Sequence, residues 1–480
     1  MSTLQDILNL ENYINGAFYN EGNGKNLAVY DKYENTLIGE VPFVSEAQME
    51  EAIASSVDGF NIIRKWSAGK RSEYLMKLKE AFESKKEAFA ELIAREAGKP
   101  LSYAKGEVDR CIVTLETAVR EAIRFSGEMV PLDYNNGEGK TAFTKRFPIG
   151  PIAAISPFNF PLNLALHKIA PALAAGCSIT LKPAPQSPLT ALAFAKLVDE
   201  VGYPAGVVNV LVADIPEAEK MVRDDRFKFF SFTGSPQVGW YLKTICGKKK
   251  VALELGGNAA VIVDDSANLK EAAKLTAIGA FLYAGQICIS TQRILVVDSV
   301  FDEFKSLLTS EINAVAAGNP MELKNSVGPI IDKTHLKRID DWVKEAVEKG
   351  AEVLAGGKIL DEEHNIYAPT LLTNTGKGMK VCDMEVFGPV ATIEKAKSFE
   401  DAIAQTNDSV FGLQAGVFTN RVDHMKYAHE ELEVGGVMIN NIPGFRIDSM
   451  PYGGVKDSGL GREGIKYTME EITEPRLIVY

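Results

Sequence analysis

Cys288 is the residue of this sequence best placed to act as a nucleophile. It ends the run of residues 285–288 (GQIC) and lies between two apolar neighbours, Ile287 and Ile289. The glycine in this run allows a tight turn, whose backbone N–H groups could face the oxyanion formed when a thiolate attacks a carbonyl. Most isolated cysteines, however, are inert apolar side chains, and Cys288 taken alone also fits that description.

The cysteines as a set give no sign of a metal or disulfide site. The chain has five, an odd number, and no two are spaced as C-x-x-C. Structural zinc sites and disulfide scaffolds usually carry paired, closely spaced cysteines. We therefore expect no metal. The five are Cys111, Cys177, Cys246, Cys288 and Cys382.

Two further segments carry groups that a nucleophilic cysteine would need. Asn159 lies in residues 157–161 (PFNFP), directly after an apolar run, where open α/β sheets bind their ligands. Glu254 precedes two adjacent glycines and is either an ordinary loop carboxylate or a general base. Taken alone, the first segment also fits a proline-bracketed turn with a structural asparagine.

Residues 459–464 (GLGREG) match the pattern G-x-G-x-x-G but do not predict a dinucleotide fingerprint. That fingerprint needs a strand before it and a complete βαβ unit after it. Too few residues follow Gly464 to form a helix, a strand and the acidic residue that binds the ribose.

The order of apolar runs and turns predicts the elements that must position these groups. Strands and turns are expected over residues 13–41, and amphipathic helices over 45–60, 70–97 and 101–125, with Ser45 as an N-cap. From residue 149 the pattern alternates between strands (151–155, 177–181, 207–212, 228–232) and helices (162–175, 189–200, 237–243). This alternation indicates parallel α/β units. A second α/β block is expected over residues 251–440, followed by a β-prone tail over 476–480.

Length and charge narrow the class of protein. A chain of 480 residues is too long for one ordinary core, so two or three domains are expected. Its longest apolar run, residues 150–155, is far shorter than the roughly 20 residues that span a bilayer. The acidic N-terminus lacks a signal-peptide core, which makes the cytoplasm the expected compartment. The net charge of −12 argues against broad nucleic-acid binding.

In their order along nearly the whole chain, these segments resemble the aldehyde dehydrogenase superfamily. Seven ordered blocks form a specific signature, and residues 284–290 look like the lactaldehyde dehydrogenase branch. The blocks are residues 157–161, 181–184 (LKPA), 232–235 (FTGS), 253–257 (LELGG), 285–288, 385–389 (EVFGP), and 451–463 from PYGG through SGLGRE.

The resemblance implies an α/β fold with two Rossmann-like parallel domains and a small β oligomerisation arm. Residues 1–123 and 146–253 would form the NAD(P)-binding domain, and residues 254–456 the catalytic domain. Residues 124–145 and 457–480 would form the arm. An exposed β-prone arm can add to a neighbour's sheet, so a homodimer or homotetramer is expected.

The resemblance also assigns the catalytic roles. Cys288 would attack the aldehyde to give a thiohemiacetal, and the Asn159 amide and the Cys288 backbone N–H would hold its oxyanion. After hydride transfer to the nicotinamide, Glu254 would activate the water that hydrolyses the thioester. Glu463 would relay or position protons, or alternatively be a dimer-contact carboxylate beside Arg462.

Cofactor residues follow from the same blocks. Gly234 and Ser235 would contact the pyrophosphate at a helix N-terminus, Lys182 the adenosine ribose and Glu385 the nicotinamide ribose. Phe387 would pack beside the nicotinamide. Pro157, Phe158, Pro185 and Leu255 complete the expected cofactor-binding set. Many NAD-preferring relatives carry a glutamate where this chain has Pro185, and they often have a glycine-rich loop at residues 213–215 (ADI). Without that carboxylate a 2′-phosphate would not be repelled, which favours NADP or use of either cofactor.

His167 and Arg446 are the expected substrate-binding residues. They stand, by counting from the motifs, where some relatives have a tryptophan and a phenylalanine. A cation and an imidazole in the tunnel would favour a small polar or anionic aldehyde, such as lactaldehyde or succinic semialdehyde. The plain alternative is a solvated loop arginine and a histidine that caps a nearby carbonyl.

Two rival functions stay open on the sequence. A coenzyme A-acylating relative would pass the acyl group to a thiol, but such relatives typically lack the carboxylate at Glu254. A non-catalytic binding or structural member would not need the complete set of Asn159, Glu254 and Cys288.

Overall fold

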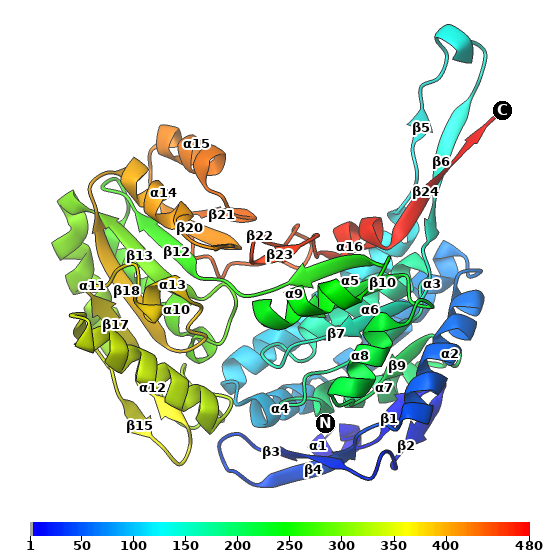
Figure 1. Cartoon of the computed structure of the whole chain (residues 1–480), viewed down its shortest axis with the longest axis horizontal. Coiled ribbons are helices and arrows are strands. Elements are labelled where there is room, and N and C mark those ends of the chain that lie inside the picture. The colour runs from blue at the N-terminus through cyan, green and yellow to red at the C-terminus, as the bar shows by residue number, and fades with distance from the viewer. Residues whose placement is uncertain (1–2) are drawn as a thin grey trace.

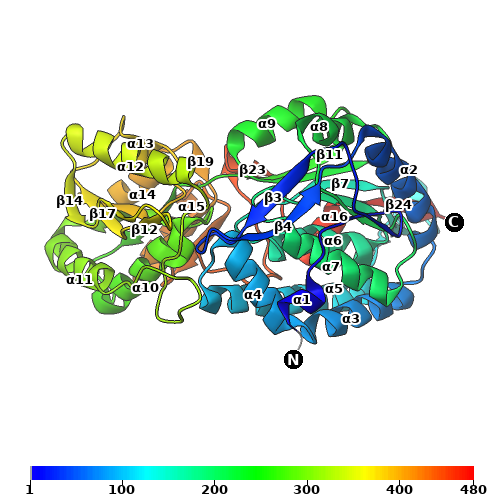
Figure 2. The same ribbon diagram turned by 90° about the horizontal axis from the view of Figure 1, so that it is seen from below.

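The computed structural model describes residues 3–480, which form two large sheets side by side and a projecting three-stranded sheet (Figures 1 and 2). The alternating pattern thus produces the predicted α/β fold with two parallel-sheet units. Within residues 3–480, no helix combines the length and hydropathy needed to cross a membrane.

The first sheet has eight strands in the order β2-β1-β9-β8-β7-β10-β11-β23. The five strands from β9 to β11 in this order are parallel, and the strands outside them pair antiparallel. The bounds are β1 (Asn12–Ile14), β2 (Ala17–Tyr19), β7 (Ile152–Ile155), β8 (Ile179–Lys182), β9 (Val208–Val210), β10 (Phe229–Thr233), β11 (Lys250–Glu254) and β23 (Gly459–Leu460).

Helices cover both faces of this sheet, because its strands are short runs of buried apolar residues. One face packs against α2 (Glu46–Ile63), α8 (Ile215–Arg223) and α9 (Pro236–Ile245). The other face packs against α3 (Ala68–Glu83), α4 (Lys86–Ala97), α5 (Leu101–Arg124), α6 (Asn163–Ala175), α7 (Leu189–Val201) and α16 (Ile465–Glu471). Ser45 caps α2 in a capping box with Gln48, as predicted.

One predicted helix is wrong. Residues 70–97 form two helices, α3 and α4, with the chain breaking at Ser84 and Lys85. Both helices pack against α5. The break carries no glycine or proline, so no local residue signals it.

The second sheet has the order β14-β17-β18-β13-β12-β20-β21 and is parallel except for β14. Its strands are β12 (Ala259–Val263), β13 (Thr291–Val297), β14 (Glu352–Ala355), β17 (Thr370–Thr373), β18 (Val390–Ala396), β20 (Gln414–Phe418) and β21 (Gly436–Ile439). One face packs against α10 (Leu269–Phe281), α11 (Phe301–Asn313), α12 (Lys333–Glu348) and α13 (Lys380–Asp383), and the other against α14 (Phe399–Asn407) and α15 (Val422–Glu431).

The third sheet projects from the body and ends near the C-terminus (Figure 1). It joins β5 (Met129–Val130), β6 (Ala142–Pro148) and β24 (Thr473–Val479). Strand β6 continues past residue 145. Strand β23 pairs with the first sheet, and α16 packs against α6 as well as contacting β24 of the arm. Short elements complete the chain: α1 (Leu4–Ile7), β3 (Asn26–Tyr30), β4 (Leu37–Pro42), β15 (Ile359–Asp361), β16 (Ile366–Tyr367), β19 (Phe411–Gly412) and β22 (Val455–Lys456).

The strand order of the first sheet locates a ligand crevice. Along the chain, β7 is the first of the five parallel strands. In the sheet it lies in the middle of them, with β8 and β9 on one side and β10 and β11 on the other. The connections after β7 and β10 therefore leave in opposite directions, which opens a crevice at the carboxyl ends of these two strands. The segments after β7 and β10 hold Asn159 and Gly234, respectively.

Candidate active site

Asn159 joins the first sheet to the loop that carries Cys288. Its Nδ2 donates a hydrogen bond to the carbonyl oxygen of Gln286 at 2.9 Å, and its Oδ1 accepts one from the Phe160 backbone N–H at 3.1 Å. The side chain is buried. Because an amide nitrogen carries two protons, Asn159 keeps one donor available beside the Cys288 loop.

The Cys288 loop has a strained backbone that buried hydrogen bonds hold in place. Tyr283, Ala284 and Gly285 all have positive φ, at 49°, 54° and 68°. A Cβ on Gly285 would meet the carbonyl oxygen of Gly388 at 2.1 Å, so the turn needs glycine there. The Gln286 side chain anchors the loop through backbone groups of a neighbouring segment. Such strain persists when the surroundings fix it, and it is common at functional sites.

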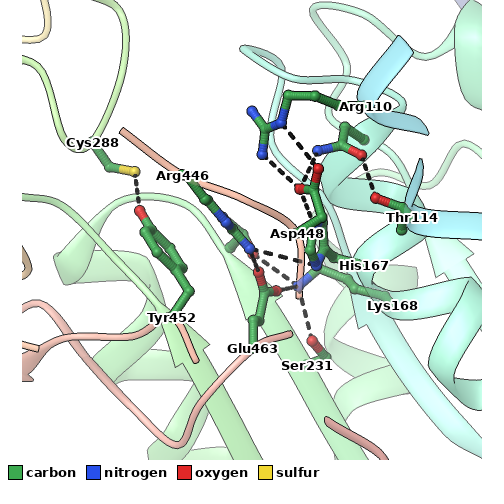
Figure 3. A network of polar contacts seen from close by, with 12 residues as sticks. Arg110, Thr114, His167, Lys168, Ser231, Cys288, Arg446, Asp448, Tyr452 and Glu463 are labelled. Atoms are coloured by element: carbon green, nitrogen blue, oxygen red, sulfur yellow. Dashed lines mark hydrogen bonds and ion pairs between the residues drawn. The ribbon is translucent and has the colours of Figure 1, made fainter. Parts of the chain in front are cut away.

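Cys288 is half-buried and contacts a tyrosine (Figure 3). Its Sγ lies 2.9 Å from the hydroxyl oxygen of Tyr452. Burial raises the pKa of the thiol to about 12, and the hydrogen bond to Tyr452 acts in the opposite direction. Cys288 is thus partly exposed as a residue and its thiol has a hydroxyl partner, whereas Cys111 and Cys177 are fully buried.

Glu254 ends strand β11 with a carboxyl group that is buried and has no hydrogen-bond partner among residues 3–480. Burial, followed by the nearby charge of Glu463, raises its pKa well above the ordinary value. Gly453 makes room for the carboxyl, since a Cβ there would come within 3.0 Å of Glu254 Oε1. A buried carboxyl with a raised pKa is typical of general acids and bases.

Glu463 is buried inside the chain, not on an exposed face beside Arg462. Its Oε1 lies 3.0 Å from Lys168 Nζ, and its Oε2 lies 3.4 Å from an Nη of Arg446. Burial alone would raise the pKa of Glu463, but the cations around it, Lys168 first, lower it to about 2. Lys168 also donates to the hydroxyls of Ser231 and Thr233 at the end of β10.

His167 and Arg446 meet in one network with Asp448 (Figure 3). His167 Nε2 lies 2.8 Å from Asp448 Oδ1, and His167 Nδ1 lies 3.4 Å from Arg446. The His167 side chain is fully buried, and the Arg446 side chain is only 6% exposed. Arg446 is therefore not a solvated loop cation, and His167 contacts Arg446 rather than a backbone carbonyl.

The Arg446 guanidinium lies flat against Tyr452, with its central carbon 3.7 Å from the ring centroid. Its Nε is buried and finds no acceptor within the described chain. By contrast, both carboxylate oxygens of Asp448 have hydrogen-bond partners, which come from Arg110, Asn163 and His167. Arg446 is thus a buried cation with an unused donor two contacts from the Cys288 sulfur.

The predicted cofactor residues line the crevice of the first sheet. Helix α9 begins after Gly234 and Ser235, and within residues 3–480 Ser235 makes no capping hydrogen bond through its side chain. The first N–H groups of α9 can therefore bind an anion. Lys182 ends β8, and burial lowers the pKa of its ammonium to about 8. Pro185 lies exposed three residues later.

The residues predicted to bind the nicotinamide end of the cofactor, Glu385 and Phe387, lie in the second domain. Glu385 accepts a hydrogen bond from the Gly257 backbone at 3.0 Å, and burial raises its pKa to about 7. A Cβ on Gly256 would lie 2.4 Å from Glu385 Oε2, so glycine shapes this wall. The rings of Phe158 and Phe387 meet edge to face, 5.7 Å apart. Pro157 is partly exposed, whereas Leu255 is buried in the core of the first domain. Together with the open N-terminus of α9, these features fit a dinucleotide.

Sequence reasoning missed four residues of this site: Arg110, Lys168, Asp448 and Tyr452. Tyr452 lies inside a recognised block, but nothing in the sequence indicates its contact with Cys288. Lys168 is an isolated cation in the apolar helix α6, and that isolation is the one signal that could have pointed to a buried partner.

Comparisons with known proteins agree with this geometry. Residues 19–478 match the model of the aldehyde dehydrogenase family. The chain is 42% identical to 3-sulfolactaldehyde dehydrogenase of Priestia aryabhattai over 100% of this chain and 99% of that protein. It is 38% identical to lactaldehyde dehydrogenase of Methanococcus maripaludis, over 95% and 97% of the two chains.

Solved structures are similar over almost the whole length. Aldehyde dehydrogenase 21 from Physcomitrella patens, in complex with the reaction product succinate, has a TM-score of 0.94 and 37% identity, covering 98% of each chain. A glyceraldehyde-3-phosphate dehydrogenase from Methanocaldococcus jannaschii complexed with NADP has a TM-score of 0.90 and 36% identity, covering 95% and 99%. Betaine aldehyde dehydrogenase from Staphylococcus aureus in complex with NAD+ has a TM-score of 0.94 and 29% identity, covering 99% and 95%.

The family match, the relatives and the meeting of Asn159, Glu254 and Cys288 at the crevice lead to one conclusion. This chain belongs to the aldehyde dehydrogenase family and is an oxidoreductase that acts on aldehydes.

Proposed function

We propose that this protein oxidises a small aldehyde with an anionic group to the corresponding acid, through a thioester on Cys288. The main support for this proposal is the position of Arg446, a buried guanidinium with an unused Nε. It stacks on Tyr452, whose hydroxyl contacts the Cys288 sulfur. A cation at that position can bind an anionic group at one end of a short substrate while its aldehyde carbon lies at the thiol. His167 and Asp448 would act through Arg446, by fixing its position.

The residues of the site divide the reaction between them. Cys288 attacks the aldehyde carbon, and the Asn159 amide and the Cys288 backbone N–H stabilise the oxyanion of the thiohemiacetal. A bound NAD(P) supplies the acceptor for the hydride. Glu254 then takes a proton from the water that hydrolyses the thioester. Glu463, held ionised by Lys168, raises the pKa of Glu254 and so strengthens Glu254 as the base that accepts this proton.

The charge of the network favours an anionic substrate. The charged members are the cations Arg110, Lys168 and Arg446 and the anions Asp448 and Glu463. Burial lowers the pKa of His167 and raises that of Glu254, which favours the uncharged form of each. The ion pairs of the network thus join three cations to two anions, and an anionic substrate group would compensate the third cation.

The named relatives support the same substrate class. They act on 3-sulfolactaldehyde and lactaldehyde, and the moss enzyme binds succinate as its product. These compounds are small and polar, and two of the three are anionic. We accordingly propose a sulfonated or carboxylated aldehyde of three or four carbons, with uncharged lactaldehyde as the weaker candidate.

For the cofactor we propose NADP, or NADP and NAD alike. Pro185 provides no carboxylate against a 2′-phosphate, and the buried ammonium of Lys182 lies nearby in the same segment. For assembly we propose a homodimer or homotetramer formed through the arm, whose exposed residues include Met129, Leu477 and Ile478.

A substrate panel tests the proposed function. The kcat/KM values for 3-sulfolactaldehyde, succinic semialdehyde, lactaldehyde and propanal are measured with each cofactor by the appearance of reduced nicotinamide. An anionic aldehyde is expected to exceed propanal by about tenfold to a hundredfold, the range of a charge-assisted hydrogen bond. A preference for propanal or for long alkyl aldehydes would refute the proposal. Addition of coenzyme A is expected to leave the free acid as the product, and formation of an acyl thioester would favour the acylating alternative.

A further inference from the structure

The Tyr452 hydroxyl touches the atom that the proposed function makes the nucleophile. Its oxygen lies 2.9 Å from Cys288 Sγ, and the two residues are 164 positions apart in the chain. Both belong to one apolar cluster with Ile287 and Leu413, which excludes much of the solvent around the sulfur. The fold therefore brings a hydroxyl donor to a sulfur that packs against a mainly apolar cluster.

We propose that Tyr452 is a catalytic residue, which donates a hydrogen bond to the Cys288 thiolate and thereby favours its formation. This inference rests on the proposed function, because it takes Cys288 as the nucleophile.

The direction of the hydrogen bond follows from the chemistry of the two groups. While sulfur is protonated, either atom can donate. Once the S–H bond breaks and its proton passes to the Glu254 carboxylate, the electron pair stays on sulfur and only the phenol can donate. Hydrogen bonds to a charged acceptor are roughly twice as strong as neutral ones, so the contact stabilises the thiolate more than the thiol. Tyr452 keeps its own proton, because burial raises the pKa of its hydroxyl well above the ordinary value.

The surroundings of Cys288 explain why a donor is needed. Burial is the largest influence on the thiol and raises its pKa to about 12; the carboxylates of Glu385 and Glu254 act in the same direction. The hydrogen bond from Tyr452 and the charge of Arg446 act against them. The Asn159 amide, which bonds to the Gln286 carbonyl, lies beside the same loop.

Two contacts hold the Tyr452 hydroxyl at the sulfur. The Arg446 guanidinium covers the ring at 3.7 Å from its centroid, and a cation over an aromatic face withdraws electron density from the phenol. The backbone of Tyr452 is paired in both directions with Glu463, at 3.0 Å and 2.6 Å. The ring is thus fixed from its face and from its backbone.

The experiment measures the reactivity of Cys288 without substrate or cofactor. Wild-type protein and Tyr452→Phe are treated with iodoacetamide over a range of pH, and the alkylation rate at Cys288 is followed by mass spectrometry. The variant keeps the ring and loses the hydroxyl. Its alkylation rate at neutral pH is expected to be about tenfold to a hundredfold lower, and its rate profile to move to higher pH.

Tyr367→Phe is the matched control. Tyr367 is also fully buried, and its hydroxyl lies 3.4 Å from Asp340 in the second domain, away from Cys288. The control is expected to leave the alkylation rate unchanged. The thermal unfolding midpoint is measured for all three proteins. As a second test, wild-type protein grown with 3-fluorotyrosine, a stronger donor, is expected to be alkylated faster than unsubstituted protein.

An unchanged alkylation profile in Tyr452→Phe, or an unchanged rate with fluorotyrosine, would overturn the inference. A fall in kcat/KM without a change in alkylation would overturn it as well, since Tyr452 would then act on the substrate. The aldehyde panel, run in parallel, separates the two proposals. If wild-type protein oxidises none of the aldehydes, the proposed function fails. If Cys288 is nevertheless alkylated faster in wild-type protein than in Tyr452→Phe, the role of Tyr452 stands.

Discussion

Glu254 and Glu463 interact as charges in one buried crevice, and their surroundings move their pKa values in opposite directions. The pKa of Glu254 rises well above its ordinary value because of burial and the charge of Glu463. That of Glu463 falls to about 2, because the cations led by Lys168 outweigh its burial. Two neighbouring carboxyls with separated pKa values can divide the work of acid and base. Here the separation supports the proposal that Glu254 is the group that gains and loses a proton during turnover.

Glu254→Gln is expected to slow hydrolysis of the thioester more than formation of reduced nicotinamide. The variant keeps the size of the side chain and removes the base. Stopped-flow absorbance should then show a rapid burst of reduced nicotinamide followed by a strongly slowed steady state. Equal losses in the burst and in the steady state would instead mean that Glu254 acts mainly on the Cys288 thiol.

Cys288→Ala is expected to abolish oxidation while leaving the fold and dinucleotide binding intact, because the covalent step has no other nucleophile. The checks are kcat, the thermal unfolding midpoint, and cofactor affinity by calorimetry. Cys382→Ala is the matched control, since Cys382 is also partly exposed and lies outside the proposed machinery. Retention of more than about a tenth of the wild-type kcat, a loss of less than about 1.4 kcal/mol, would contradict the assignment.

The fold could be predicted from local patterns, and the central groups of the site from the resemblance of their segments to one family. Buried runs such as Ile152–Ile155 alternate with amphipathic helices, and that period predicts a parallel sheet covered on both faces. Residues 459–464 form no dinucleotide fingerprint, as predicted, since Gly459 and Leu460 form an edge strand antiparallel to β11. The segments of Asn159 and Cys288 meet through the Gln286 carbonyl, as their membership of one signature implies.

The supporting contacts could not be predicted, because each joins side chains far apart in the chain. Lys168 and Glu463 are 295 residues apart, and His167 and Asp448 are 281 apart. Neither periodicity nor spacing indicates which buried cation meets which buried carboxylate. The break between α3 and α4 escapes prediction as well, because no glycine or proline marks where the first helix ends.

Lys168→Met is expected to move the rising limb of the kcat–pH profile to higher pH. The charge of Lys168 lowers the pKa of Glu254, so its removal raises that pKa further, and less of the base is ionised at a given pH. At neutral pH kcat should therefore fall, and the loss should shrink as the pH rises. Lys168→Arg keeps the charge and should retain the wild-type profile. A uniform loss at every pH in Lys168→Met would indicate a purely structural role.

Pro185→Glu is expected to raise the preference for NAD over NADP. A carboxylate at this exposed position would accept hydrogen bonds from ribose hydroxyls and repel a 2′-phosphate. The measurement is kcat/KM for both cofactors in both proteins, with Pro185→Gln as the uncharged control. The idea fails if the ratio is unchanged, or if the wild-type protein already prefers NAD strongly.

Arg446→Ala is expected to lower kcat/KM more for anionic aldehydes than for propanal. The Arg446 guanidinium is buried, stacks on Tyr452 and retains a free Nε within the described chain, so it can offer a charged donor to a carboxylate or sulfonate. Such a bond contributes roughly 1.5–3 kcal/mol. The variant should therefore lose about tenfold to a hundredfold in kcat/KM for succinic semialdehyde or 3-sulfolactaldehyde. The loss on propanal should be much smaller and should equal the contribution of Arg446 to the reactivity of Cys288.

The matched control is Arg421→Ala, which removes an exposed arginine that pairs with Asp423. It should leave both substrates unaffected. The conservative variant Arg446→Lys keeps the charge but not the flat stacked fork, and it should recover part of the activity on the anionic aldehyde. Equal losses on anionic aldehyde and propanal in Arg446→Ala would mean that the residue only supports Tyr452 and Glu463. A larger loss on anionic substrates, partly restored by lysine, would place Arg446 at the substrate.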